Sequence, residues 1–199
     1  MDLAQLIKGK RVLVTGASSG LGLHFARLFA RCGCGLVLGA RRTEKLEQLA
    51  PELHQAGSPQ VDCLALDVTD PDSVAAAFVA IHRSGSLLDV VINNAGISGE
   101  GLALTQEVQA FDAVMHTNLR GTWLVAIQAA RAWKENGHSG GVIVNIGSIQ
   151  GEGVAPGLSA YSASKAGVAH LTRNLALEWA RYGIRINTLE PGYIRTDSP

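Results

Sequence analysis

Two residues capable of acid–base chemistry, Tyr161 and Lys165, lie four positions apart in the run YSASKAG at 161–167. On a helix this spacing places both side chains on one face, a single turn apart. A lysine ammonium near a phenol favours the phenolate, so a tyrosine that ordinarily titrates near pH ~10 can exchange protons closer to neutrality. Such a tyrosine can act as general acid or base toward a carbonyl or an alcohol. The same spacing also decorates solvated helix faces, so the pair needs support from the rest of the chain.

Short apolar, β-branched runs alternate with longer amphipathic stretches along the chain. The predicted strands are Arg11–Thr15, Leu36–Ala40, Val61–Ala65, Val90–Asn93, Val142–Ile146 and Ile184–Leu189. The predicted helices lie near Gly20–Cys32, Glu44–Gln55, Pro71–His82, Val108–Lys134 and Ala160–Tyr182. Strands with little polar alternation suit a parallel sheet covered on both faces, and strict strand–helix alternation predicts a doubly wound, Rossmann-like α/β fold. Ligands of such sheets bind beyond the carboxyl ends of the strands.

Composition favours a single domain over residues 1–199, with 47% hydrophobic and 17% charged residues. Seventeen basic residues balance 17 acidic ones, so no overall field attracts nucleic acid or anionic lipid, and phosphate recognition must be local. The N-terminal segment 1–10 does not resemble a secretory signal, and no run approaches the roughly 18 apolar residues of a membrane span. We therefore expect a soluble, cytoplasmic protein.

The cysteines and histidines give no sign of a metal site or a disulfide framework. Cys32, Cys34 and Cys63 are odd in number and lack a C-x-x-C spacing, which favours reduced thiols. The six histidines are scattered, with no His/Cys/Asp cluster at ligand spacing, so no metal is expected.

A glycine-rich turn follows the first predicted strand and opens the first helix. Its sequence at 15–22 is TGASSGLG, spaced G-x-x-x-G-x-G. Glycine permits close approach of a ligand to the backbone, and a helix N-terminus offers unpaired N–H groups to a pyrophosphate. The predicted phosphate-binding residues are Thr15, Gly16, Ser18, Ser19, Gly20, Leu21 and Gly22.

The residues after the second strand predict which dinucleotide binds. A carboxylate at this place would hold a ribose 2′-hydroxyl, and Ala40 cannot do so. Arg41, helped by Arg42, can instead hold a 2′-phosphate through paired N–H donors. This favours NADP(H) over NAD(H), with NAD(H) still open; two solvated arginines before a helix are the alternative reading.

Further short motifs follow in a fixed order along the chain. They are Asp67-Val68, Asn93-Asn94-Ala95-Gly96, Asn118, Ser148 thirteen positions before Tyr161, and Pro191-Gly192 with Ile194 and Thr196. Together with the glycine turn and the Tyr161–Lys165 pair, this set resembles the short-chain dehydrogenase/reductase family. The resemblance runs from about Lys10 to Asp197 and rests on the ordered set, since each motif alone is weak.

The resemblance implies a place for the cofactor and a role for each matching residue. Asp67 and Val68 would contact the adenine, and Asn94, Ala95 and Gly96 would lie along the cofactor. The nicotinamide carboxamide would be held by the segment containing Pro191, Gly192, Ile194 and Thr196.

The resemblance also implies a catalytic set for interconverting a carbonyl and a secondary alcohol. Tyr161 would transfer the proton, and Lys165 would bind the nicotinamide ribose and favour the phenolate. Ser148 would donate a hydrogen bond to the reacting oxygen, and Asn118 would position a water that links Lys165 to solvent. The hydride comes from the cofactor.

Family members usually continue past this point with a substrate-covering loop, a further strand and an oligomer contact. The resemblance therefore implies that the C-terminal strand and substrate loop are missing here, and that a homodimer or homotetramer forms if the C-terminus is complete. An impaired or non-catalytic nucleotide-binding fragment of the same fold is the alternative. A narrower alternative is a 3-oxoacyl-thioester reductase.

Two hydrolase-like motifs compete with this interpretation. G-x-S-x-G occurs at 16–20 and S-x-x-K at 162–165. The first lies at the opening strand, where Gly22 is better explained by phosphate approach, and the second lacks its companion motifs. Hydrolysis is therefore disfavoured.

Two features leave their roles open. Apolar residues in the predicted helices near 111–133 and 160–182 spread over more than one face, which suits either deep burial or a subunit interface. Glu190 precedes Pro191-Gly192, where the family more often has a small or uncharged residue. Its carboxylate either faces the substrate space, favouring a hydroxylated or cationic substrate, or is solvated or paired with an arginine. The sequence does not name the substrate.

Overall fold

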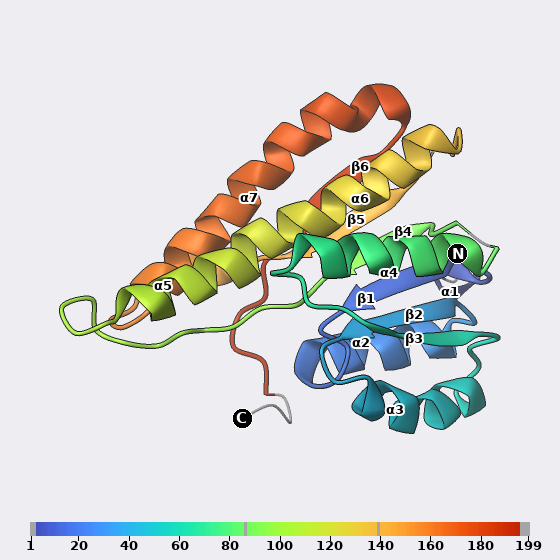
Figure 1. The fold of residues 1–199 in the computed structure, drawn as a ribbon, viewed down its shortest axis with the longest axis horizontal. Coiled ribbons are helices and arrows are strands. Elements are labelled where there is room, and N and C mark those ends of the chain that lie inside the picture. The colour runs from blue at the N-terminus through green and yellow to red at the C-terminus, as the bar shows by residue number, and fades with distance from the viewer. Residues whose placement is uncertain (1–2, 86, 139, 196–199) are drawn as a thin grey trace.

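The protein is built around a six-stranded parallel sheet (Figure 1), seen in a computed structural model that describes residues 3–85, 87–138 and 140–195. The strands are β1 (Arg11–Thr15), β2 (Gly35–Ala40), β3 (Val61–Ala65), β4 (Val90–Asn93), β5 (Val142–Ile146) and β6 (Arg185–Leu189). Their order in the sheet is β3-β2-β1-β4-β5-β6. This order confirms the predicted doubly wound, Rossmann-like fold.

Helices cover both faces of the sheet (Figure 1). They are α1 (Leu3–Ile7), α2 (Gly20–Arg31), α3 (Thr43–Gln55), α4 (Pro71–Arg83), α5 (Val108–Val114), α6 (Gly121–Glu135) and α7 (Ser159–Trp179). Because strand side chains alternate between faces, Val12 and Val14 join the core under α2 and α3. Leu13, between them, joins the core under α4, α6 and α7. The short helix α1 was not predicted.

One predicted helix is interrupted beside the site. The stretch predicted as continuous from Val108 to Lys134 contains the π-helical segment Met115–Arg120 between α5 and α6. π-Helical turns carry one extra residue and occur often at functional sites. The extra residue turns the apolar positions before and after it onto different faces, which accounts for the spread of apolar residues in the predicted helix.

The strand order creates a crevice at one point of the sheet. β1 pairs with β2 on one side and with β4 on the other. The chain that leaves β1 crosses toward β2, and the chain that leaves β4 crosses toward β5, so the two connections run in opposite directions. The loops after β1 and β4 therefore separate, and a ligand can enter between them. β1 ends at Thr15 and β4 at Asn93, which brings the glycine turn and the Asn94–Gly96 segment to this crevice.

Some of the large apolar side chains on α6 and α7 are buried in the core, and others are exposed to solvent. Trp133 is 1% exposed, whereas Leu177 is 83% exposed and Trp123 is 40% exposed. Core packing therefore accounts for only part of these residues. The three cysteines are free thiols, as predicted, and burial raises the pKa of Cys34 to about 11.

Candidate active site

The turn between β1 and α2 is shaped to approach a ligand with its backbone. Gly16 and Gly20 have φ values of 66° and 56°, a region that favours glycine. A Cβ on Gly16 would lie 2.9 Å from Ala95 Cα, and one on Gly22 would collide with the Gly16 carbonyl. Ser19, the N-cap of α2, makes no side-chain capping hydrogen bond. The first N–H groups of α2 are thus free of a side-chain cap, as an anion site requires.

Hydrogen bonds between the ends of β1 and β4 hold this turn in place. Thr15 Oγ1 accepts from the backbone N–H groups of Asn94 and Ala95, both at 3.0 Å. The Asn94 amide donates back to the Thr15 carbonyl at 3.0 Å and to the Gly16 carbonyl at 3.3 Å. Thr15 is therefore a scaffold residue whose hydroxyl organises the turn.

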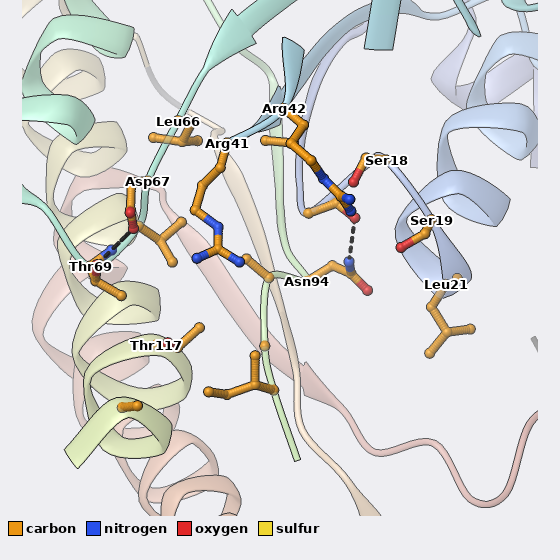
Figure 2. Close-up of a pocket in the computed structure, with 18 of the residues that line it drawn as sticks. Ser18, Ser19, Leu21, Arg41, Arg42, Leu66, Asp67, Thr69, Asn94 and Thr117 are labelled. Atoms are coloured by element: carbon orange, nitrogen blue, oxygen red, sulfur yellow. Dashed lines mark hydrogen bonds between the residues drawn. The ribbon is translucent and has the colours of Figure 1, made fainter. Parts of the chain in front are cut away.

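The crevice forms a cavity of about 730 Å³ at the carboxyl end of the sheet (Figure 2). Of the predicted cofactor residues it is lined by Gly16, Ser18, Ser19, Gly20, Leu21, Arg41, Arg42, Asp67, Val68, Asn94, Ala95, Gly96, Gly192 and Ile194. Among the remainder, Thr15, Gly22, Pro191, Tyr161 and Lys165 are not in its lining. Thr196 lies outside the described residues. Segments far apart in sequence thus converge on one cavity.

Seven lining residues were not predicted: Ala40, Leu66, Thr69, Ile97, Ala113, His116 and Thr117. Thr69 had a usable signal, because a threonine two residues after an aspartate often closes an Asx-type turn. The last three lie at the junction of α5 with the π-helical segment. A regular helix over Val108–Lys134, as predicted from the sequence, gives no reason to expect these three residues at a ligand cavity.

Charge at one end of the cavity is concentrated in Arg41, Arg42 and Asp67. Figure 2 shows the Arg41 side chain reaching over the cavity between Asp67 and Asn94, with Arg42 extending toward Ser18. Burial raises the pKa of Asp67, but hydrogen bonds from the Thr69 hydroxyl and N–H, with the nearby Arg41 charge, outweigh it and leave the pKa below its usual value. Both arginines are exposed and form no hydrogen bond or ion pair with the part of the chain that the structure describes.

Lys165 is buried on α7 beneath the Asn94–Gly96 segment. Its Nζ donates to the Ile146 carbonyl at 2.7 Å and lies 5.6 Å from the centre of the Tyr161 ring. Burial lowers the pKa of Lys165 from 10.5 to about 8. A Cβ on Gly96 would lie 3.6 Å from this Nζ, so the lysine reaches the backbone of a cavity-lining residue. The predicted pair is therefore brought together next to the cavity.

Asn118 lies at the centre of the π-helical segment and is fully buried. Its Oδ1 accepts from Ile97 N at 2.8 Å, and its Nδ2 donates to the Ile97 carbonyl and to Ser164 Oγ. Ser164 Oγ in turn donates to the Tyr161 carbonyl at 2.7 Å. Asn118 thus ties the loop after β4 to the first turn of α7. The water-positioning role implied by the resemblance stays a prediction.

Ser148 is positioned by the turn that follows β5. It caps the short 3-10 segment Ile149–Gly151, its Oγ accepting from Gln150 N at 3.1 Å. Gly151 packs so closely on α7 that a Cβ there would lie 3.2 Å from the Ala166 nitrogen. Ser148 is consequently held against the helix that carries Tyr161 and Lys165.

The described ranges contain neither a metal-binding cluster nor a membrane-spanning helix. No group of three or more His, Cys, Asp or Glu side chains in residues 3–85, 87–138 and 140–195 could hold a metal ion. No helix in those ranges is long and apolar enough to cross a bilayer.

The fold and the cavity together define a dinucleotide-binding α/β protein with an acid–base pair beside the ligand crevice. The family model described as "short chain dehydrogenase" matches residues 10–199. The chain belongs to the short-chain dehydrogenase/reductase family, whose members are NAD(P)-dependent oxidoreductases acting on small molecules.

Relatives and solved structures support this assignment. Gluconate 5-dehydrogenase of Gluconobacter oxydans is 38% identical over 96% of this chain and 73% of its own length. The 3-oxoacyl-[acyl-carrier-protein] reductase of Thermotoga maritima is 36% identical over 96% of this chain and 76% of its own. A short-chain type dehydrogenase/reductase from Mycobacterium marinum superimposes with a TM-score of 0.92, at 35% identity, covering 98% of this chain and 77% of that one. Actinorhodin polyketide ketoreductase with NADPH gives 0.89 at 36% identity, covering 95% and 72%.

Proposed function

We propose that the protein interconverts a carbonyl and a secondary alcohol with NADP(H) as the favoured cofactor and Tyr161 as general acid and base. The observation that carries this proposal is the buried Lys165 ammonium, 5.6 Å from the Tyr161 ring and under the wall of the dinucleotide cavity. The pair thus brings a buried cation beside a phenol that can donate or accept a proton.

The cavity residues fit a dinucleotide phosphate. The α2 N-terminus and the glycine turn suit the pyrophosphate, and glycine at 16 and 22 lets the turn pack closely on Ala95 and on the Gly16 carbonyl. The exposed guanidinium of Arg41 suits a 2′-phosphate, since no hydrogen bond or ion pair with the described residues occupies its fork of donors. The residue at the place of a ribose-binding carboxylate is Ala40. When bound, the cofactor supplies the hydride.

The remaining steps belong to side chains of this chain. During reduction the Tyr161 hydroxyl gives its proton to the carbonyl oxygen, and during oxidation the phenolate removes the proton from the alcohol. Ser148 Oγ, which accepts from Gln150 N, donates a hydrogen bond to the same oxygen and stabilises the charge that develops there. Lys165 keeps its position through the Ile146 carbonyl. Asn118 and Ser164 fix the distance between the loop after β4 and α7.

The test is to follow oxidation of NADPH by absorbance with a panel of carbonyl compounds: sugars, xenobiotic ketones, steroids and 3-oxoacyl thioesters. We expect turnover that requires Tyr161, and binding of NADPH tighter than binding of NADH in a calorimetric competition. Equal or tighter binding of NADH would contradict the cofactor preference. Binding of NADPH without turnover of any carbonyl would favour a non-catalytic or impaired nucleotide-binding protein.

A 3-oxoacyl-thioester reductase is the second candidate. Two observations favour it: a 3-oxoacyl-[acyl-carrier-protein] reductase at 36% identity and a polyketide ketoreductase with NADPH at a TM-score of 0.89. Preference for acetoacetyl thioesters over free ketones in the same panel would select this narrower function.

A further inference from the structure

Only one of the two carboxylate oxygens of Asp67 is bound by the protein. Its Oδ1 accepts from the Thr69 hydroxyl at 2.7 Å and from the Thr69 N–H at 2.9 Å (Figure 2). No donor of the part of the chain that the structure describes reaches Oδ2, and Asp67 lines the cavity. Oδ2 is therefore the oxygen left to accept a hydrogen bond from a ligand in the cavity.

The residues around this turn are held by the chain that leads into α6. Arg120, the last residue of the π-helical segment, donates from Nη1 to the Thr69 carbonyl at 2.7 Å. A Cβ on Gly121 would lie 2.8 Å from Val68 Cγ2 and 3.1 Å from the Val68 carbonyl oxygen, so glycine permits the close packing at this point. Val68 and Thr69 line the cavity, whereas Arg120 and Gly121 do not. Arg120 can therefore influence a ligand only through the residues that it holds.

The N-terminal turn of α4 is a second anchor of the same segment. Ser73 Oγ accepts from the Asp67 N–H at 3.0 Å, and the Asp67 carbonyl accepts from Asp70 N at 3.2 Å. The Asp70 carboxylate in turn caps α4 by accepting from Asp72 N. Because these bonds do not involve Arg120, we expect variants at position 120 to fold and the segment to lose only one of its anchors.

A carboxylate oxygen distinguishes adenine from hypoxanthine at one atom. C6 of adenine carries an amino group, which donates a hydrogen bond, whereas C6 of hypoxanthine carries a carbonyl, which only accepts. Burial raises the pKa of Asp67, but the hydrogen bonds from Thr69 and the nearby Arg41 charge outweigh it and leave the pKa below its usual value. The group at position 67 is therefore an ionised acceptor at neutral pH, which attracts the amino group and repels the carbonyl.

We propose that Thr69 and Arg120 are positioning residues for adenine recognition: Thr69 holds one oxygen of the Asp67 carboxylate, Arg120 holds Thr69, and the second carboxylate oxygen accepts from the 6-amino group. The inference rests on the dinucleotide binding in the proposed function and extends it to a residue outside the cavity. The π-helical segment then serves both ends of the site, through Asn118 at one end and Arg120 at the other.

Calorimetry with NADPH and its deamino analogue, in which hypoxanthine replaces adenine, tests this assignment without a carbonyl substrate. The wild-type protein is expected to bind NADPH about tenfold to a hundredfold more tightly than the analogue, the range for one hydrogen bond to a charged group. In Arg120→Met this ratio falls by about threefold to tenfold, and Arg120→Lys, which keeps a donor, restores most of it. NADPH and NADH weaken by the same factor in Arg120→Met, because both contain adenine.

Asp67→Asn tests the orientation of the side chain. Both Thr69 donors point to the Oδ1 position, so the amide oxygen takes that place and the amide N–H group faces the ligand. This variant is expected to reverse the preference and bind the deamino analogue more tightly than NADPH. Thr69→Val removes one of the two donors and lowers the preference of the otherwise wild-type protein, whereas Thr69→Ser keeps it.

Arg131→Met is the matched control. Arg131 is an exposed arginine of α6, about three turns further along the chain and outside the cavity lining, so its replacement leaves the ratio unchanged. An unchanged ratio in Arg120→Met, an equal fall in Arg131→Met, or a continued preference of Asp67→Asn for NADPH would overturn the inference.

The same measurements separate this inference from the proposed function. The expected ratios without turnover of any carbonyl would contradict the proposed function and support the roles of Thr69 and Arg120. Turnover of a carbonyl together with equal binding of NADPH and the analogue would do the reverse. Failure of the wild-type protein to bind either dinucleotide would refute both.

Discussion

The two ends of the site are built on opposite principles. At the Arg41 end both arginines are exposed, and neither makes a hydrogen bond or ion pair with the described residues. At the Tyr161 end the polar groups are buried and joined to one another: Lys165 to Ile146, and Asn118 to Ile97 and Ser164. Exposed charges can be exchanged at small cost to stability, whereas buried networks are expensive to disturb. We therefore expect substitutions at the Arg41 end to cost little stability, and substitutions in the network around Tyr161 to cost more.

The largest expected effect comes from removing one oxygen at the buried end. Tyr161→Phe keeps the ring and its contacts but loses the proton donor, so we expect kcat to fall by about 10²–10⁴-fold. Affinity for NADPH, measured by calorimetry, changes little because the exposed end is intact. A variant with near wild-type kcat would remove Tyr161 from the mechanism.

Lys165→Ala is expected to weaken both catalysis and cofactor binding. The ammonium lies under the cavity wall as well as beside Tyr161, so both kcat and NADPH affinity are expected to fall, each by about tenfold or more. Steady-state kinetics and calorimetry on the same preparation measure the two. If neither quantity changes, lysine has no part in catalysis.

The burial of Lys165 also predicts how stability depends on pH. Burial lowers its pKa from 10.5 to about 8, so between those pH values the unfolded chain binds more protons than the folded protein. The free energy of unfolding therefore rises with pH across this window, by up to about 3 kcal/mol from this group. Urea unfolding of the wild type and of Lys165→Met isolates the contribution, because every other titratable group is present in both proteins. A parallel pH dependence of the two proteins would show that the ammonium is not desolvated.

The sequence predicted the exposed end of the site better than the buried end. The glycine turn and Arg41 follow strand ends directly, so period and turn chemistry were sufficient to place them, whereas Asp67 was predicted through the family resemblance. The π-helical segment around Asn118 was missed, since apolar residues on more than one face suit a deeply buried regular helix as well as an interrupted one. The Asn118–Ser164 link joins positions 46 residues apart, and such long-range pairing is a product of packing that local patterns do not contain.

The smallest expected effect is at the exposed end. Arg41→Ala removes the proposed 2′-phosphate contact, and we expect the dissociation constant of NADPH to rise by about tenfold while that of NADH is almost unchanged. Arg120→Ala is a suitable control, because Arg120 is a cation that donates to the Thr69 carbonyl and does not line the cavity. An equal rise in the dissociation constants of NADPH and NADH would mean that Arg41 does not recognise the 2′-phosphate.

The division of labour between the two ends is tested most directly by measuring kcat and the NADPH dissociation constant for wild type, Arg41→Ala, Tyr161→Phe and the double variant. Because the two side chains act on different steps, the account predicts that Arg41→Ala changes only the dissociation constant and Tyr161→Phe only kcat, with effects that add in the double variant. A large loss of kcat in Arg41→Ala, or of NADPH affinity in Tyr161→Phe, would contradict it.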